Sequence, residues 1–150
     1  MNVETVFNIA NNGILIFWLL LIVAPRWRVT ELLVQSVAIP VVIGLTYTWL
    51  IATVFFGGAL PAGGNFSSLH GVMMFFTSPV AATAGWIHYL VFDLFVGSWE
   101  VRDAQRRGIP HLAVVPCLVL TLLAGPVGLL LYVGLRFGMR RGGFLIEDPA

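Results

Sequence analysis

The stretch GWIHYLVFDLF, residues 85–95, places a histidine and an aspartate inside a run that is otherwise apolar or aromatic. On membrane-insertion scales an aspartate near the middle of a lipid-facing helix costs about 3 kcal/mol. Asp93 is therefore expected to face protein or a bound molecule and not bare lipid. Ionisable residues inside a membrane are rare and commonly mark functional sites. This stretch is therefore a candidate functional site.

The composition is that of an integral membrane protein. Of the 150 residues, 59% are hydrophobic and only 10% are charged, and the mean hydropathy is +0.94. Soluble domains contain roughly 25% charged residues. The net charge of +1 is too small, and the arginines are too scattered, for a nucleic-acid-binding surface, so we expect no nucleic-acid partner.

The apolar segments predict an all-α, polytopic membrane protein that forms one domain over residues 1–150. Four transmembrane helices are expected, at about residues 6–24, 32–56, 79–97 and 112–136. Pro40 predicts a kinked second span, and Gly125-Pro126-Val127-Gly128 predicts a kink or a close helix contact in the fourth. The glycine-rich loop at 57–68 leads to a short interfacial helix, capped by Ser67 or Ser68 and ending near Thr77.

Four spans place the connections at 25–31 and 98–111 on one side of the membrane. These connections carry five arginines, against three after the last span, so the positive-inside rule favours them as cytoplasmic, with both termini opposite. All basic residues are arginines, and neither a cleaved signal nor a transit peptide is evident. We therefore expect the cytoplasmic membrane of a bacterium.

If the helix of the third span continues into the polar segment that follows it, a stripe of functional residues is expected along one of its faces. Residues seven apart return to nearly the same helix face, and four such residues are Trp86, Asp93, Glu100 and Arg107. Tyr89 and Asp103 lie beside this stripe. The face thus carries aromatic residues inside the membrane and acidic residues toward its edge.

His88 lies about 140° around the helix from Asp93, so the two cannot share one face. Each residue also has a structural interpretation. Asp93 would then pair with an arginine such as Arg102 or Arg106, or accept hydrogen bonds that join helices, and His88 would hydrogen-bond a neighbouring helix. A proton-transfer role for His88 is equally open.

Metal binding and covalent catalysis are not expected. The candidate metal ligands do not form a compact ligand pattern; they are His88, Asp93, Glu100, Asp103 and His111. Cys117 is the only cysteine, so it can form neither an internal disulfide nor a cysteine cluster.

Several motifs resemble the abscisic-acid-deficient-4-like membrane family. They are Trp86-Ile87-His88, Asp93-Leu94-Phe95, Asp103, Pro116-Cys117-Leu118 and Gly125-Pro126-Val127-Gly128. Plant members of this family, which reside in plastid membranes, are implicated as neoxanthin synthases. The resemblance implies isomerisation of a xanthophyll epoxide, such as violaxanthin, to an allenic product. That reaction needs no redox cofactor, and none is expected.

The resemblance also implies roles for individual residues. Asp93 would be the acid that protonates the epoxide oxygen, since removal from water favours the neutral form of a carboxyl group. His88 or Glu100 would accept the proton. The carotenoid, or another hydrophobic polyene, would lie against the aromatic and hydroxyl side chains of Trp86, Tyr89, Phe92 and Tyr47.

Two other functions remain open. The chain could be a non-catalytic membrane subunit that binds a pigment or lipid or stabilises a larger complex, which would suit its aromatic-rich helices. A channel or small transporter is a third interpretation, although only one span carries ionisable residues. Membrane lipids are expected partners in each case, and a homo-oligomer is compatible with all three.

Overall fold

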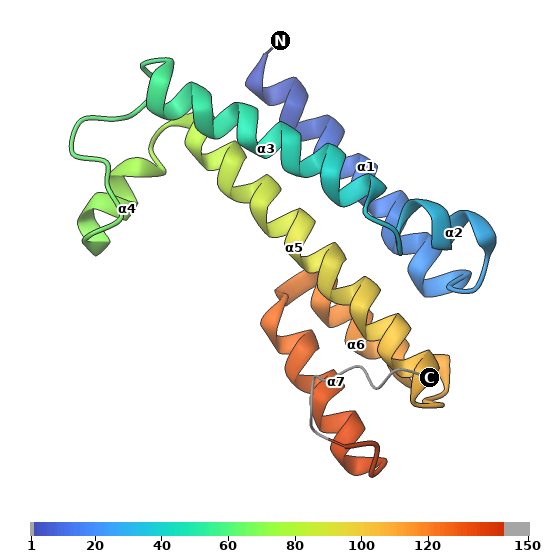
Figure 1. The fold of residues 1–150 in the computed structure, drawn as a ribbon. Helices are drawn as coiled ribbons and strands as arrows, with labels where there is room; N and C mark the ends of the chain where they lie inside the picture. The colour runs from blue at the N-terminus through green and yellow to red at the C-terminus, as the bar shows by residue number, and fades with distance from the viewer. Residues whose placement is uncertain (1, 143–150) are drawn as a thin grey trace. The chain divides into compact units, whose positions relative to one another are not determined.

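The computed structural model describes residues 2–142, and within this range it contains helices, turns and loops but no strand. The helices are α1 (Val3–Val23), α2 (Arg28–Leu33), α3 (Ala38–Phe56), α4 (Leu69–Phe75), α5 (Pro79–Arg106), α6 (His111–Ala124) and α7 (Pro126–Gly138) (Figure 1). The all-α fold class is confirmed. The chain divides into two compact units, residues 1–95 and 96–150, and α5 contributes to both.

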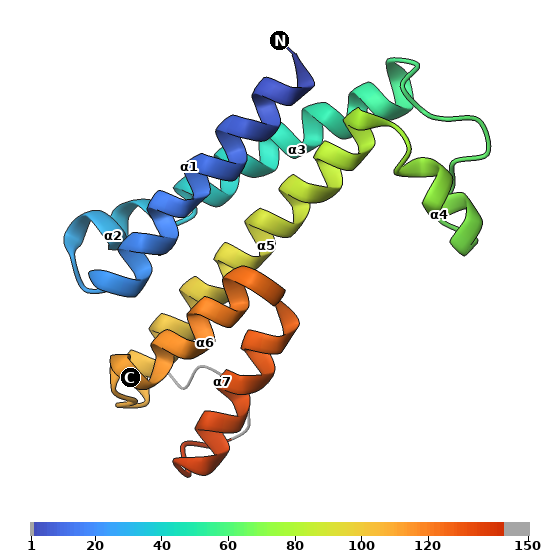
Figure 2. The ribbon, with the colours of Figure 1, turned by 180° about the vertical axis from the view of Figure 1, so that it is seen from behind.

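The first unit is built around α1, α3 and the N-terminal part of α5. Their shared core contains Val6, Leu50, Ala84 and Ile87. Two opposite views show α1 and α3 side by side and joined through α2 (Figures 1 and 2). The short helix α4 packs onto this unit through Phe75, which contacts α3 and α5 at Val54 and Ala81.

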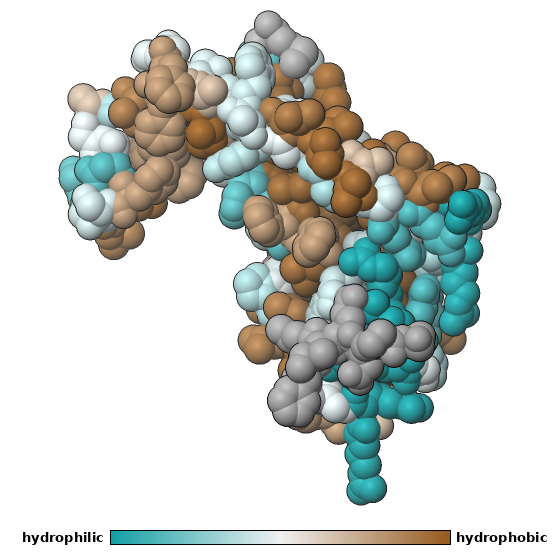
Figure 3. Space-filling view, viewed as in Figure 1, coloured by the Kyte–Doolittle hydropathy of each residue, from teal (hydrophilic) through white to brown (hydrophobic). Residues whose placement is uncertain are grey.

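Three helical segments are long and apolar enough to cross a membrane. They are Val3–Val23, Arg28–Phe56 and Pro79–Arg106. Large apolar side chains remain exposed along them, including Ile16, Leu45 and Phe92. The space-filling view shows broad hydrophobic surfaces on this part of the chain (Figure 3), which is the surface expected of helices that contact lipid.

The second expected span is interrupted before Pro40. The turn between α1 and α3 is held by Thr30 Oγ1, which donates to the Ala24 carbonyl at 2.7 Å, and by Gln35 Nε2, which donates to the Pro25 carbonyl at 2.6 Å. Since α3 begins at Ala38, Pro40 lies in its first turn, where a missing N–H leaves no helical bond unmade. Pro40 therefore does not kink α3, and the break in the Arg28–Phe56 segment comes before it.

The helix expected after the glycine-rich loop is confirmed as α4. Ser68 is its N-cap, and the Ser68 hydroxyl accepts a hydrogen bond from the Gly71 amide at 3.0 Å. This is the contact for which serine is favoured at a helix N-terminus. Its location at the membrane interface stays a prediction.

The second unit consists of the C-terminal part of α5 with α6 and α7. The single helix expected over 112–136 is wrong, because the chain reverses at Gly125. Gly125 has φ +37°, a left-handed conformation that glycine adopts without a Cβ clash, and Pro126 starts α7 with its fixed φ. The result is a helical hairpin, α6–α7, beside the C-terminal part of α5 (Figures 1 and 2).

Candidate functional site

Two residues of the predicted stripe, Trp86 and Asp93, form a continuous column on α5 with Tyr89, which was predicted beside the stripe. The Trp86 and Tyr89 rings have centroids 5.3 Å apart, and the Tyr89 side chain hydrogen-bonds to Asp93. The spacings of three and four residues are those that bring side chains together along one helix face. The column therefore leads from an indole through a phenol to a carboxyl group, and all three members were predicted from the sequence.

The Asp93 carboxyl group is buried and only partly satisfied. The residue is 9% exposed, and its Oδ2 atom has no hydrogen-bond partner within residues 2–142. Asp93 also makes no ion pair in this range, and Arg102 Nη1 instead donates to Ser98 Oγ at 2.7 Å. The expected alternative, an Asp93–arginine tether, is thus wrong. A buried carboxyl oxygen without a partner is costly, and a catalytic role is one reason for a protein to keep it.

The indole at the start of the column is held from α1. Trp86 Nε1 donates a hydrogen bond to Asn11 Oδ1 at 3.0 Å, and the Phe7 ring lies 6.1 Å from the indole. Trp86 is nevertheless 41% exposed, so part of its face is open. Asn11 was missed by the sequence reasoning, although the pair Asn11-Asn12 inside an apolar run was a visible signal.

His88 belongs to a different face of α5. Its ring lies 5.7 Å from the Tyr47 ring of α3 and 4.6 Å from the Phe92 ring. The ring contacts of His88 are thus made with Tyr47 and Phe92, outside the column that leads to Asp93. The four predicted substrate-binding residues therefore separate into two pairs, with Trp86 and Tyr89 near Asp93 and with Tyr47 and Phe92 near His88.

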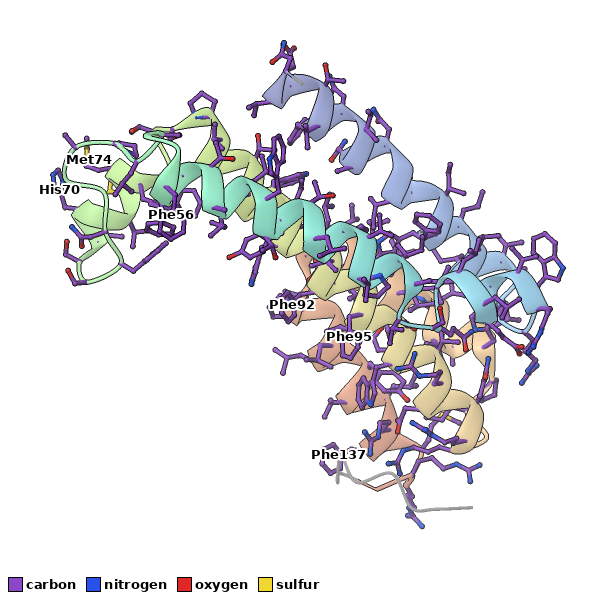
Figure 4. All side chains as sticks on the ribbon, turned by 45° about the horizontal axis from the view of Figure 1, so that its top comes forward. Phe56, His70, Met74, Phe92, Phe95 and Phe137 are labelled. Atoms are coloured by element: carbon purple, nitrogen blue, oxygen red, sulfur yellow. The ribbon has the colours of Figure 1, made fainter. Side chains whose placement is uncertain are left out.

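Two apolar hollows lie in the first unit. One, of about 290 Å³, is lined by α1, α3 and Ile87, and among its lining residues only Thr46 is polar. The other, of about 280 Å³, is lined by Pro40, Gly44, Val91, Phe92 and Phe95. Figure 4 shows Phe92 and Phe95 projecting from α5. Ligand pockets commonly have volumes of roughly 300–1,000 Å³, so either hollow fits part of an elongated apolar molecule.

Glu100 belongs to the second unit. It is fully buried, and both of its carboxylate oxygens accept from the Thr121 hydroxyl of α6, at 3.0 and 3.2 Å. The sequence placed Glu100 near a solvated edge, whereas in the structure its side chain has 0% exposure. Thr121 was missed, because nothing in its own sequence neighbourhood shows that it meets a carboxylate.

Asp103 lies at the centre of a buried ionic cluster. Its carboxylate accepts from the Tyr132 hydroxyl at 2.5 Å and from Arg107 Nε at 2.8 Å, and it forms an ion pair with Arg136 at 3.4 Å. The Trp99 ring contacts Tyr132 edge-on and also lies beneath the Arg136 guanidinium. Tyr132 and Arg136 were not predicted as members of a site. This cluster joins α7 to α5 through the contacts of Asp103 with Tyr132 and Arg136.

Within the part of the chain that the structure describes, no three His, Cys, Asp or Glu residues come together as metal ligands. His88, Glu100 and Asp103 each have ring or polar partners of other kinds. The group that stands out chemically is the Asp93 carboxyl.

Comparison with known proteins gives two matches. The family profile described as ABA DEFICIENT 4-like matches residues 5–132. Protein ABA DEFICIENT 4, chloroplastic, from Arabidopsis thaliana is 29% identical over 132 residues, which cover 84% of this chain and 58% of that protein. The chain thus spans less than two thirds of its plant relative. No solved structure matches it. Because the profile covers most of the chain, including α1, α3, α5 and α6, the protein belongs to the ABA DEFICIENT 4-like family.

Proposed function

We propose that this protein is a membrane-embedded enzyme that isomerises a carotenoid epoxide to an allenic alcohol. Family membership supports carotenoid chemistry, since plant members are implicated as neoxanthin synthases. The observation that carries the proposal is the buried Asp93 carboxyl, which lies beside Tyr89 and has one oxygen without a partner. Buried carboxyl groups with this incomplete satisfaction are good candidates for proton transfer.

The proposed reaction is redox-neutral. The epoxide oxygen gains a proton as one of its C–O bonds breaks, and the neighbouring polyene carbon loses a proton. The C–H electron pair becomes the second double bond of the allene, and the former epoxide oxygen becomes a hydroxyl group. One proton enters and one leaves, so the product is an isomer of the substrate and the reaction consumes no cofactor.

Asp93 is assigned as the acid. The Tyr89 contact fixes the direction of its carboxyl group, as a proton donor requires. Once the proton has gone to the epoxide, the same carboxylate has a second oxygen, Oδ2, available to accept the proton from carbon. A single carboxyl group whose Oδ2 atom has no hydrogen-bond partner would therefore serve both steps.

His88 is the alternative proton acceptor. It would take the proton if the reacting end of the polyene lay against Tyr47 and Phe92, where the structure places the imidazole. Glu100, the third predicted catalytic residue, receives a structural role in this proposal. Both of its oxygens accept from Thr121, so its carboxylate is committed to α6.

The polyene would lie on the aromatic and apolar surface of the first unit. Trp86 and Phe92 are 41% and 56% exposed, and a hollow of about 280 Å³ lies beside Phe92. An apolar substrate dissolved in the bilayer reaches such a surface without passing through water. The three long apolar helices would cross the membrane, which we expect to be the cytoplasmic membrane of a bacterium.

Pigment binding without catalysis is the second candidate. The 290 Å³ hollow favours it, because Thr46 is its only polar lining residue and the Thr46 hydroxyl already donates to the Val42 carbonyl at 3.1 Å. A carotenoid or lipid in this hollow would be held but not protonated. Such a subunit could work as a homo-oligomer or inside a larger membrane complex.

Incubation of the purified protein with violaxanthin separates the two candidates. Chromatography of the extracted pigment is expected to show a new allenic isomer that is absent from a heat-treated control. Co-purification of unchanged carotenoid, without a new product, would support the binding function and contradict the isomerase. Bound pigment is measured by its absorbance spectrum in the same sample.

A further inference from the structure

The α6–α7 hairpin is too short to cross a membrane with either helix. Helix α6 has 14 residues and α7 has 13. At 1.5 Å per residue their lengths are about 21 and about 20 Å, against a hydrocarbon core of roughly 30 Å. Each helix nevertheless exposes large apolar side chains, among them Leu123, Leu130 and Phe137. Lengths and exposures of this kind fit a hairpin that enters a membrane only part of the way.

The backbone conformation of Gly125 and the close packing of α6 on α7 produce the reversal at the tip of the hairpin. Gly125 turns the chain with φ +37°, and α6 and α7 then pack so closely that a Cβ added to Gly128 would overlap the Thr121 backbone nitrogen. Residues at the tip are apolar and exposed, as Leu123 and Val127 show. The tip therefore suits an apolar environment, and its close packing favours the hairpin over one straight helix.

The start of α6 and the end of α7, which together form the open end of the hairpin, are joined by a hydrogen bond. Arg107, directly after α5, donates through Nη1 to the carbonyl of Arg141, which follows α7, at 2.7 Å. Arg107 also donates to Asp103, and Asp103 accepts from Tyr132 of α7. Charged residues thus gather at the open end, while the tip carries none. A membrane-embedded element that dips in from one surface has this polarity.

We infer that α6 and α7 form a re-entrant hairpin that enters and leaves the membrane on the same side, with its tip among the acyl chains of one leaflet. This inference rests on the proposed crossing of the membrane by the three long helices. It replaces the fourth span expected from the sequence. The lipid-contacting surface consists of exposed apolar residues on α6 and α7, namely Leu123, Val127, Leu130 and Leu131.

Charge distribution along the chain supports this topology. With three crossing helices and a returning hairpin, the order of the elements puts the connection after α1, the connection after α5 and the segment after α7 on one side. All 8 basic residues of the sequence, every one an arginine, lie in or next to these segments. Four spans divide the same arginines five to three. The positive-inside rule strongly prefers the first arrangement, with the arginine-rich side cytoplasmic.

Cysteine labelling in membrane vesicles tests the inference. Single cysteines would replace Pro110, before α6, and Gly138, at the end of α7, in a Cys117→Ser background. Both positions are exposed, and a Cβ at Gly138 meets no atom within 4 Å. A membrane-impermeant maleimide is expected to label both from the cytoplasmic side. Labelling of the two positions from opposite sides would overturn the hairpin and restore a fourth span.

A second pair of cysteines tests the proposed membrane crossing by itself. Its result shows whether an error lies in the hairpin inference or in the membrane crossing on which that inference rests. Trp27→Cys and Ala62→Cys lie at the two ends of the Arg28–Phe56 segment, and both positions are exposed. These cysteines should label from opposite sides. If both label from one side, the membrane crossing itself is wrong and the hairpin inference falls with it. A reporter protein fused to the C-terminus of the full chain should be cytoplasmic, independently of any cysteine substitution.

Discussion

The Tyr132 hydroxyl donates a 2.5 Å hydrogen bond to Asp103 Oδ2, and this contact joins the last helix of the hairpin to α5. Both residues are buried, with 0% exposure for Tyr132 and 4% for Asp103. Arg107 and Arg136 form ion pairs with the same carboxylate. The contact explains how two short helices are held firmly to a longer one, because a buried carboxylate loses much of its stabilisation when a donor is removed.

Removing this hydroxyl should destabilise the protein. In Tyr132→Phe the Asp103 carboxylate loses a buried donor, and hydrogen bonds to charged groups contribute about 1.5–3 kcal/mol. We expect a lower thermal unfolding midpoint for the detergent-solubilised variant. Phe137→Leu, on an exposed side chain of the same helix, is the matched control and should change stability by less than about 0.5 kcal/mol. Equal midpoints for Tyr132→Phe and the unmodified protein would show that the cluster does not hold α7.

Two glycines of α7 should respond in opposite directions to alanine. A Cβ on Gly128 overlaps the Thr121 backbone, so Gly128→Ala must separate the two helices and should cost about 1–3 kcal/mol. A Cβ on Gly134 meets nothing within 4 Å, so Gly134→Ala should stabilise the helix by about 1 kcal/mol. Thermal unfolding of the two variants measures the difference. Similar effects of both substitutions would contradict the close packing of α6 on α7.

The Asn11 amide should matter through the orientation of Trp86. Asn11→Leu removes the acceptor for the indole N–H, whereas Asn12→Leu changes an exposed neighbour of the same type. Loss of a hydrogen bond that contributes about 1.4 kcal/mol corresponds to a tenfold change in an equilibrium constant, such as that for substrate binding. We expect roughly tenfold less isomer from Asn11→Leu at limiting substrate, and little change from Asn12→Leu. Equal losses from both variants would mean that the Asn11–Trp86 contact does not position substrate.

A substitution of His88 tests whether His88 or the Asp93 carboxylate accepts the proton. Since His88 lies against Tyr47 and Phe92 and not in the Asp93 column, His88→Gln should leave the yield of isomer within about threefold if Asp93 serves both steps. The pH dependence of the initial rate should also stay unchanged. A loss of about 100-fold or more, with a changed pH profile, would instead identify His88 as the base.

The sequence predicted what depends on spacing within one helix. The serine cap of α4, the continuation of the third span into a polar segment, and the separation of His88 from Asp93 all follow from helical geometry. Predictions from the sequence were wrong where a contact between two helices determines the path of the chain. Whether Gly125-Pro126 kinks or reverses the chain depends on the packing of Gly128 against Thr121, which spacing along one helix cannot show.

The same limit explains the residues that were missed. Tyr132 and Arg136 occur in an apolar segment and carry no local motif, so their meeting with Asp103 is visible only in the fold. Glu100 was placed at an edge because its neighbours are polar, yet Thr121 encloses it. Asp93 was predicted correctly as an inward-facing residue, because the cost of exposing a carboxyl group to lipid is a property of the single residue.

Stability separates a functional Asp93 from a structural one. Since Asp93 Oδ2 has no partner, replacing this oxygen by the amide nitrogen in Asp93→Asn breaks no hydrogen bond at that atom and should leave the unfolding midpoint unchanged. Asp103→Asn removes the centre of the ionic cluster and should lower the midpoint. If Asp93→Asn destabilises as strongly as Asp103→Asn, Asp93 has a structural role that the described contacts do not reveal.

The central claim, that the Asp93 carboxyl protonates the substrate, is tested most directly by measuring the allenic isomer formed from violaxanthin by purified Asp93→Asn. General acid catalysis contributes about 100- to 10,000-fold, so the account predicts a loss of isomer of that size while carotenoid binding and the unfolding midpoint are preserved. An unchanged rate of isomer formation in this variant would contradict the account.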